Sequence, residues 1–533
     1  MMNTTAEMYL KGNDLQEKIN KLHYLYQPID LNYIFHESKM RAIKSMKSII
    51  KESNRRSIQE CDYSDLLVCS LTLVYYFGMR LKINMLKRRF WIKCDKKLFH
   101  RAESAFQDTL NVLQPECSEK TIRITLDFFS NIPLWPYENF VTQILEVVLY
   151  YSRGRITLFN LMLTDIHCVV FSDVKSARHR MRVLYELLKS DNWIINKQKL
   201  LPFITRLLDF FTCSIAKGTE GIVIYRYLKK GFEVCLRRIF ERTENRCRLI
   251  IITTMLNWFS MANMDNDEVL EFSSLIEQAA QLYQVGQYSE SFQEHVFSDV
   301  LANFVGSSNG VYSLVGCRLM VRFLDRHCNA AYLSMPAIYY EFSQTPLKVA
   351  EYNGNDKAFL RHYREQIHDY SIKVVQYHSY SQINLRTMFS LIACTILEVP
   401  CSLTAAAASC LMMTIQDFAL TQEKIPDRSR FWLHAIVLSI MSLICWVHKA
   451  PDLYRYVNEI ISRRAKDAPQ LNPPLLKTYN LQSQHAYWKK STLFFEDWEL
   501  RYGLWKHFQA ARQKDRINQN KMAKKKPIMD INT

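Results

Sequence analysis

A chain of 533 residues with only 12 glycines and 14 prolines lacks the turn chemistry that sheets and α/β loops require, which argues against β and α/β folds. None of its 14 cysteines forms a Cys-x-x-Cys pair, and the first residues lack the apolar stretch of a secretory signal, so we expect free cysteines in a reducing compartment. The formal net charge of +17 favours an anionic partner, either nucleic acid or the inner leaflet of a membrane.

The rest of the composition indicates a helical chain. Leu, Ile, Lys and Arg are abundant, and no low-complexity spacer interrupts the sequence before its tail. At this length we expect a continuous all-α solenoid, a rod of helix-pair repeats with a period of ~40 residues. Because the sequence shows no clean repeat, the repeat must be structural. The expected division is an N-terminal segment at 1–38, the solenoid at 39–505 and a basic, disordered tail at 506–533.

The first basic segment covers residues 39–56. Met40, Ile43, Met46 and Ile50 recur in it at helical spacing, with basic residues between them. This pattern predicts a basic amphipathic helix.

The strongest concentration of charge lies between residues 80 and 101, where nine Lys and Arg face a single acidic residue, for a local charge of +8. Lys82, Arg89, Lys93 and Lys96 follow one another at spacings of seven, four and three, which places them on one helical stripe. Ile83, Leu86, Phe90 and Leu98 line another stripe. A basic helix of this kind is typical of a membrane-surface or anion-binding face, while the solvated outer face of a solenoid helix is an equal alternative. The predicted membrane- or anion-binding residues are Arg80, Lys82, Lys87, Arg88, Arg89, Lys93, Lys96, Lys97 and Arg101.

One segment matches a catalytic motif. Gly306 to Gly310 fits G-x-S-x-G, in which Ser308 would be the nucleophile on a turn between a strand and a helix. The apolar residues before it have helical spacing, however, so we expect a turn between two helices and no catalytic residue. His362, His368 and His378 lack the pairing with a glutamate that a zinc protease needs and are expected at the surface, with no metal site.

Two long apolar runs follow. The first, 387–415, has Glu398 as its only charged residue and is interrupted by Pro400, which predicts two helices. The second, 432–447, contains His434. A membrane span needs ~20 consecutive apolar residues, and polar groups at the bilayer centre are costly, so both runs are better explained as buried helical core.

Several segments of this region resemble a known family. They are FLDRHCN at 323–329, FLRHYREQIHDY at 359–370, IQDFA at 415–419 and VNEIISRRAKDAP at 457–469. In order and spacing they resemble the armadillo-type core of the Rolling blackout (eighty-five-requiring) family, the plasma-membrane scaffolds for type III alpha phosphatidylinositol 4-kinase. The resemblance is best over 323–469 and indicates a diverged member with an armadillo/HEAT-like fold.

The resemblance implies a non-catalytic scaffold that helps recruit or stabilise the kinase complex at the cytoplasmic face of the plasma membrane. Its implied partners are anionic phospholipid and the phosphatidylinositol 4-kinase complex, reached through a tetratricopeptide partner and a hyccin-like protein. No cofactor or small-molecule substrate is implied. Family members carry an N-terminal cysteine cluster for palmitoylation, whereas the first cysteine here is Cys61, and loss of that anchor would leave the protein cytoplasmic. The chain also looks shorter after Pro469 than the family's long C-terminal extension.

Two alternatives come from other classes. A basic helical-repeat module could bind nucleic acid or nuclear transport cargo, since basic solenoids also serve there. A lipase or esterase using Ser308 is the lower alternative. Near the end of the chain, Trp488, Trp498 and Trp505 with Tyr487 and Tyr502 form an aromatic stripe, for which helix core is expected over a docking anchor.

Overall fold

The computed structural model describes residues 2–524 apart from 87–91, 114–116, 153–154, 191–196, 220–222, 262–264, 293, 477–478 and 480–487. Every regular element in this part of the chain is a helix, which confirms the all-α prediction. The chain divides into two compact units, unit 1 at Met1–Cys247 and unit 2 at Arg248–Thr533. The division into 1–38, 39–505 and 506–533 stays a prediction.

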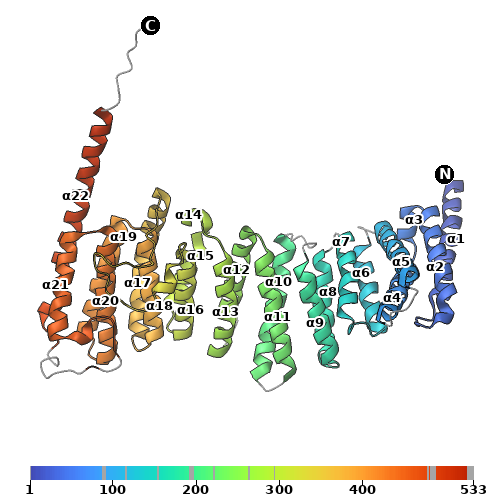
Figure 1. Cartoon of the computed structure of the whole chain (residues 1–533), viewed down its shortest axis with the longest axis horizontal. Helices are drawn as coiled ribbons and strands as arrows, with labels where there is room; N and C mark the ends of the chain where they lie inside the picture. The colour runs from blue at the N-terminus through green and yellow to red at the C-terminus, as the bar shows by residue number, and fades with distance from the viewer. Residues whose placement is uncertain are drawn as a thin grey trace, which may run out of the picture. The chain divides into compact units, whose positions relative to one another are not determined.

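Unit 1 is a succession of helices in which each packs mainly on the next and the next but one, the contact pattern of a helical-repeat solenoid. Figure 1 shows these helices in chain order, from blue to green. They are α1 (Met2–Tyr26), η1 (Tyr33–Phe35), α2 (His36–Glu52), α3 (Arg55–Glu60), α4 (Ser64–Leu86), α5 (Ile92–Leu113), α6 (Ser118–Asn131), α7 (Glu138–Tyr151), α8 (Arg155–Val169), α9 (Val174–Lys189), α10 (Lys197–Thr219) and α11 (Val223–Arg242).

The amphipathic helix predicted at 39–56 corresponds to α2, which buries Ile43 and Met46, but it ends at Glu52, and Arg55 and Arg56 begin the separate helix α3. Lys39 of α2 is also buried, and its ammonium donates to the backbone carbonyls of Tyr26 and Pro28. Burial lowers the pKa of Lys39 to about 8, because a charge is poorly solvated there. One of the basic residues of α2 therefore lies inside the structure and does not add to the positive charge of its surface.

Unit 2 follows the same packing pattern, with α18 contacting both α16 and α20, and α19 contacting α17 and α20. Its elements, which begin with the helix at the boundary, are α12 (Asn245–Met261), α13 (Asn266–Leu282), α14 (Tyr288–Ser291), α15 (Glu294–Asp299), the π-helical η2 (Val300–Val305), α16 (Gly310–Leu324), η3 (Asn329–Tyr332), α17 (Gly354–His378), α18 (Gln382–Glu398), α19 (Ser402–Thr421), α20 (Asp427–His448), α21 (Pro451–Asp467), η4 (Pro469–Leu471), η6 (Ser491–Leu493) and α22 (Asp497–Lys524).

Helix boundaries follow local chemistry where the sequence supplies it. Asp265 begins α13 with a capping box, because its carboxylate accepts from the N–H of Glu268 while the Glu268 carboxylate accepts from the N–H of Asp265. The break predicted at Pro400 is confirmed, since α18 ends at Glu398 and α19 begins at Ser402.

Three described helices are long and apolar enough, by length and composition alone, to cross a membrane: α4, α19 and α20. More than half of the apolar window of each is nevertheless buried inside the structure. In α20, the Ser439 hydroxyl exchanges two hydrogen bonds with the backbone of Ala337, and the Ser442 hydroxyl accepts from the N–H of Tyr339, so polar side chains of this helix serve internal packing. The interpretation of these runs as helical core is supported by that burial.

Candidate anion-binding surface

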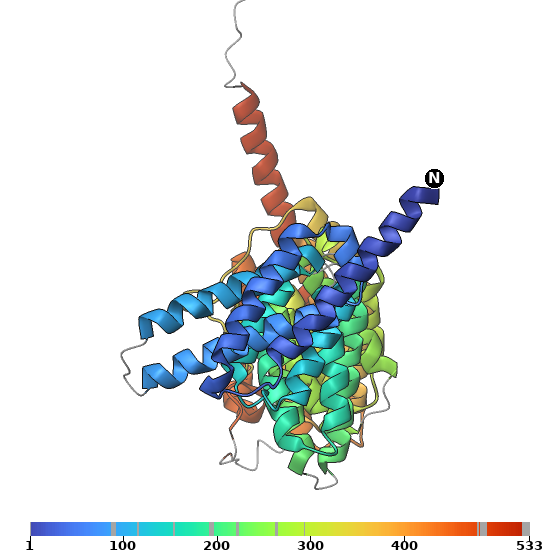
Figure 2. The same cartoon turned by 90° about the vertical axis from the view of Figure 1, so that its right-hand side faces the viewer.

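The described residues of the basic segment at 80–101 belong to two helices. α4 ends at Leu86, α5 begins at Ile92, and the two helices pack against each other. The prediction of one helical stripe is therefore wrong, because Lys82 belongs to α4 whereas Lys93 and Lys96 belong to α5. Figure 2 shows this hairpin, in light blue, extending beyond the neighbouring helices of unit 1.

Most of the predicted basic residues of the hairpin face solvent. Lys82, Lys93, Lys96, Lys97 and Arg101 are all exposed. Lys87, Arg88 and Arg89 lie outside the described residues. We call the five exposed residues the hairpin basic surface.

Arg80 differs from the others because it is half-buried. Its guanidinium lies over the rings of Tyr33 and Tyr76, at 4.7 and 5.5 Å from their centroids, and donates to the Tyr76 hydroxyl at 3.3 Å. Such stacking fixes the side chain against the base of the hairpin. Arg80 is thus a structural residue first, and a weaker candidate for contact with an external anion.

The single acid of the segment is turned inward. Asp95 is 5% exposed, and its Oδ2 accepts from Nδ2 of Asn84 on α4 at 2.6 Å. This bond ties the two helices of the hairpin together. Because the Asp95 carboxylate is buried between the two helices, it does not pair with the lysines on the outer face of the hairpin, and that face stays positively charged.

The end of the hairpin also carries apolar side chains. Met85 is 52% and Leu86 76% exposed, although Leu86 was expected in the apolar packing stripe together with Leu98, which is buried. Exposed aliphatic side chains bordered by lysines are the composition of a surface that contacts the membrane interface.

A second cluster, in unit 2, joins the FLDRHCN segment to Asp356 and Glu398 by buried charges. Nε of Arg326 donates to Glu398 at 3.1 Å, and its Nη1 donates to Asp356 at 2.9 Å. Glu398 also accepts from the backbone N–H of His327 at 3.1 Å and lies 2.9 Å from its ring Nδ1, while the Arg326 guanidinium covers the ring of Tyr288 at 4.3 Å. We call these residues the Glu398 network.

The electrostatics of the Glu398 network are those of a satisfied structural site. The side chains of Glu398 and Asp356 are 1% and 2% exposed, and buried charges are stable only when paired. Burial opposes the charge of Arg326, but Tyr288 and the hydrogen bonds to Asp356 and Glu398 raise its pKa above the ordinary value. The network joins α14, α17 and α18 to the turn after α16.

Other residues of FLDRHCN also make hydrogen bonds within the structure. Asp325 accepts from the backbone N–H groups of Asn329 and Ala330 at 2.8 and 2.7 Å. The amide of Asn329 exchanges two hydrogen bonds with the backbone of Lys348. These contacts hold the turn in which Cys328 has a left-handed φ of 59°. FLDRHCN, one of the four segments that carry the resemblance, is therefore held in its fold by its own polar contacts.

The Gly306–Gly310 segment connects the helices η2 and α16, as predicted, and no strand precedes it. Asn309 caps α16 by accepting from the N–H of Val311. His378 contacts this segment through its Nε2, which lies 2.8 Å from the carbonyl oxygen of Ser307. The strand–turn–helix geometry of a nucleophile elbow is absent from this described segment.

The three histidines considered for metal binding do not converge. His362 is exposed and His368 half-buried, whereas His378 is buried, so the expectation that all three lie at the surface is wrong for His378. Among the described residues, no group of three or more His, Cys, Asp or Glu side chains could hold a metal ion.

The C-terminal aromatic residues split between core and surface. Trp488 is buried, although in a turn rather than in the expected helix, and Tyr487 lies outside the described residues. Trp498 and Trp505 are instead 69% and 57% exposed, and Tyr502 stacks between them with centroid distances of 5.6 and 6.0 Å. The expectation of helix core is wrong here because α22 buries the other face, through Leu500 and Leu504.

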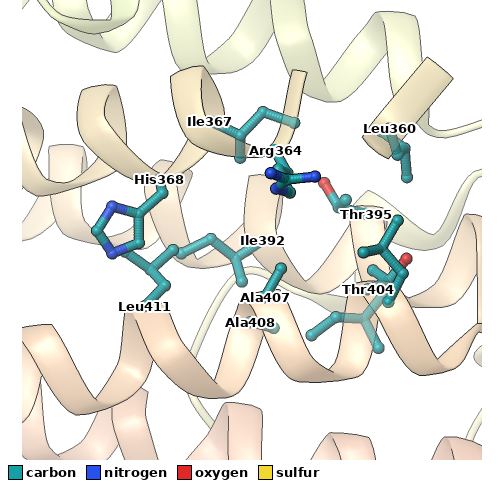
Figure 3. A pocket seen from close by; sticks show the side chains of 12 residues that line it. Leu360, Arg364, Ile367, His368, Ile392, Thr395, Thr404, Ala407, Ala408 and Leu411 are labelled. Atoms are coloured by element: carbon teal, nitrogen blue, oxygen red, sulfur yellow. The ribbon is translucent and has the colours of Figure 1, made fainter. Parts of the chain in front are cut away.

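A small apolar recess lies between α17, α18 and α19. In Figure 3 Arg364 and His368 line one side and Ala407, Ala408 and Leu411 the other. Its volume is about 50 Å³, whereas pockets for substrate-sized ligands have about 300–1,000 Å³. This recess fits a single aliphatic group.

Comparison with known proteins identifies the chain's relatives. A family model described as EFR3, armadillo repeat, matches residues 87–501. Protein EFR3 homolog B of Homo sapiens is 23% identical over 156 residues, which are 29% of this chain and 19% of that protein. Protein EFR3 homolog cmp44E of Drosophila melanogaster is 28% identical over 181 residues, 32% of this chain and 21% of that protein. The matched part thus spans about a fifth of the length of these relatives. No solved structure matches the chain significantly.

Proposed function

Because this chain belongs to the EFR3 armadillo-repeat family, which confirms the resemblance found in its sequence, we propose that it is a non-catalytic scaffold of the plasma membrane. In this role it helps recruit or stabilise a complex of type III alpha phosphatidylinositol 4-kinase at the cytoplasmic face. Family membership is the observation that carries the proposal. The partners suggested by the resemblance are a tetratricopeptide protein and a hyccin-like protein.

The hairpin basic surface supports the membrane part of the proposal. It offers Lys93, Lys96 and Lys97 on α5 and Lys82 on α4, next to the exposed Leu86. Each Lys or Arg near an anionic leaflet contributes about 1 kcal/mol, and salt weakens this contribution. Inserted aliphatic side chains add a contribution that salt does not screen.

Vesicle co-sedimentation tests this surface. The variant Lys93→Glu/Lys96→Glu should bind phosphatidylserine vesicles at least about tenfold more weakly, since two attractive charges become repulsive. The control Lys175→Glu/Arg178→Glu changes the net charge by the same amount, at exposed positions of α9, and should bind like the unmodified chain. Equal losses in both variants would show that net charge alone, rather than the hairpin, governs binding.

The kinase part of the proposal needs a separate test. The tagged chain should co-purify the type III alpha kinase from cells, and Trp498→Ala/Trp505→Ala should weaken capture, because exposed Trp and Tyr side chains dominate protein interfaces. Trp488→Phe, a conservative change at a buried site, is the folding control. Absence of the kinase from the purified material would overturn the scaffold assignment even if vesicle binding persists.

The nucleic-acid alternative is tested with the same protein. Lysines act as point charges and would bind any polyanion, so duplex DNA and anionic vesicles are compared at equal salt. The proposal expects vesicle binding to outlast DNA binding as salt rises, because only the vesicle offers an apolar phase to Met85 and Leu86. The reverse order would favour a nucleic-acid or transport-cargo module.

A further inference from the structure

A cavity in unit 2 lies between the first two turns of α18 and of α20. Its volume is about 210 Å³. Two arginines line it, Arg386 from α18 and Arg428 from α20, together with the polar side chains of Gln382 and Tyr479. The remaining lining residues are Met335, Phe431, Trp432, Leu475 and Leu476.

The two guanidinium groups of the cavity are held in place without an acid. Arg386 lies over the ring of Trp432, 5.8 Å from its centroid. Gln382, in the amide orientation that satisfies its neighbours, accepts from Nε of Arg428 at 3.2 Å and from Nε1 of Trp432 at 3.3 Å. No described lining residue is acidic, and neither arginine has an ion-pair partner within the described part of the chain.

Two guanidinium groups that line one cavity at its solvent-exposed edge, with no acid among the described lining residues, favour an anion. A carboxylate is satisfied by one bidentate arginine, whereas a tetrahedral phosphate presents oxygens to two arginines arriving from different helices. Both arginines lie near helix N-termini, whose dipoles add to the attraction of negative charge. A phosphate group is therefore the anion that this geometry fits best.

The other polar groups of the cavity suit the rest of such a ligand. The hydroxyl oxygen of Tyr479 accepts from the backbone N–H of Leu476 at 2.8 Å, which leaves its O–H as a donor toward the cavity. The Gln382 amide can bond a ligand hydroxyl, and the buried Trp432 ring provides an apolar floor. We propose that this cavity binds the phosphate monoester of a small hydroxylated molecule, either free or as the headgroup of a lipid. The proposal is independent of the scaffold function.

Isothermal titration calorimetry on the full chain tests the site, with inorganic phosphate and glycerol 3-phosphate as probes and acetate and glycerol as controls. Saturable binding of the two phosphates, but not of acetate or glycerol, is expected. Arg386→Met and Arg428→Met should each weaken it about tenfold or more, as expected for loss of a charge-assisted hydrogen bond. Arg322→Met, at an exposed position of α16, should leave binding unchanged.

Vesicles distinguish the two sources of the phosphate. Phosphatidylcholine vesicles containing phosphatidic acid, a monoester, are compared with vesicles containing as much phosphatidylserine, a diester. If Arg386→Met/Arg428→Met lowers binding only to phosphatidic acid, the site takes a lipid headgroup. If it abolishes glycerol 3-phosphate binding while vesicle binding is unchanged, the ligand is soluble. A double variant that alters neither, while melting like the unmodified chain, refutes the site.

Discussion

Removal of the Glu398 carboxylate is the most direct test of what stabilises unit 2. In Glu398→Ala the guanidinium of Arg326 loses one of its two carboxylate partners and keeps Asp356 at 2.9 Å. His327 loses the acceptor of both its backbone N–H and its ring. The change therefore leaves donors unpaired in a buried place without removing the charge of Arg326.

The expected magnitude follows from the burial of the network. Removing one partner of a buried ion pair costs about 3–5 kcal/mol, and the surviving bond to Asp356 places this variant at the lower end, at about 3 kcal/mol. A unit of this size loses about 2 °C of melting temperature per kcal/mol, so its transition should fall by about 6 °C.

Thermal unfolding followed by circular dichroism measures this effect. The control Glu365→Ala removes an exposed carboxylate that pairs with its neighbour Arg364, and it should cost less than about 1 kcal/mol. In Arg326→Met/Glu398→Leu the cation is removed with only one of its two acids, so Asp356 stays buried without its ion-pair partner and the loss should exceed that of Glu398→Ala. A loss below about 1 kcal/mol in Glu398→Ala would refute the view that the network carries stability.

Two further predictions concern packing and pH. A Cβ at Gly316 would approach the backbone nitrogen of Val305 to 2.5 Å, so Gly316→Ala should destabilise unit 2 by roughly 1–3 kcal/mol in urea unfolding, whereas Gly286→Ala, where a Cβ meets nothing within 4 Å, should not. Burial, helped by His507, lowers the pKa of His448 to about 4, below its ordinary value of about 6.5. The unfolded chain then binds more protons between these values, so stability should fall as pH drops through this window, and His448→Leu should flatten that slope in melts from pH 7 to 4.5.

The sequence predicted those features whose cause is local. The break between α18 and α19 follows from Pro400, and α2 follows from the spacing of its apolar residues. The break within 80–101 could not be predicted, because this segment contains neither Gly nor Pro and its charges fit a single helix. Which face of α22 is buried was equally undetermined, since Leu500 and Leu504 repeat at the same helical spacing as Trp498 and Tyr502.

Long-range pairings lay beyond the reach of sequence patterns. Arg326 and Glu398 are 72 residues apart, and Arg386 and Arg428 line one cavity only because α18 and α20 pack side by side. One signal was available, the single charge of Glu398 within an otherwise uncharged apolar run. It argued correctly for a buried helix, and it also implied a buried cation that the sequence could not identify.

The Glu398 network also constrains how this chain can change over generations. Its members come from separate stretches between Tyr288 and Glu398. A substitution at one position therefore leaves a buried ionised group without its partner until a second substitution occurs at a distant position. Related sequences should accordingly either keep all residues of the Glu398 network or have aliphatic residues at all of these positions. The residues of the Glu398 network should therefore indicate common ancestry better than the surface lysines, which can be substituted one at a time.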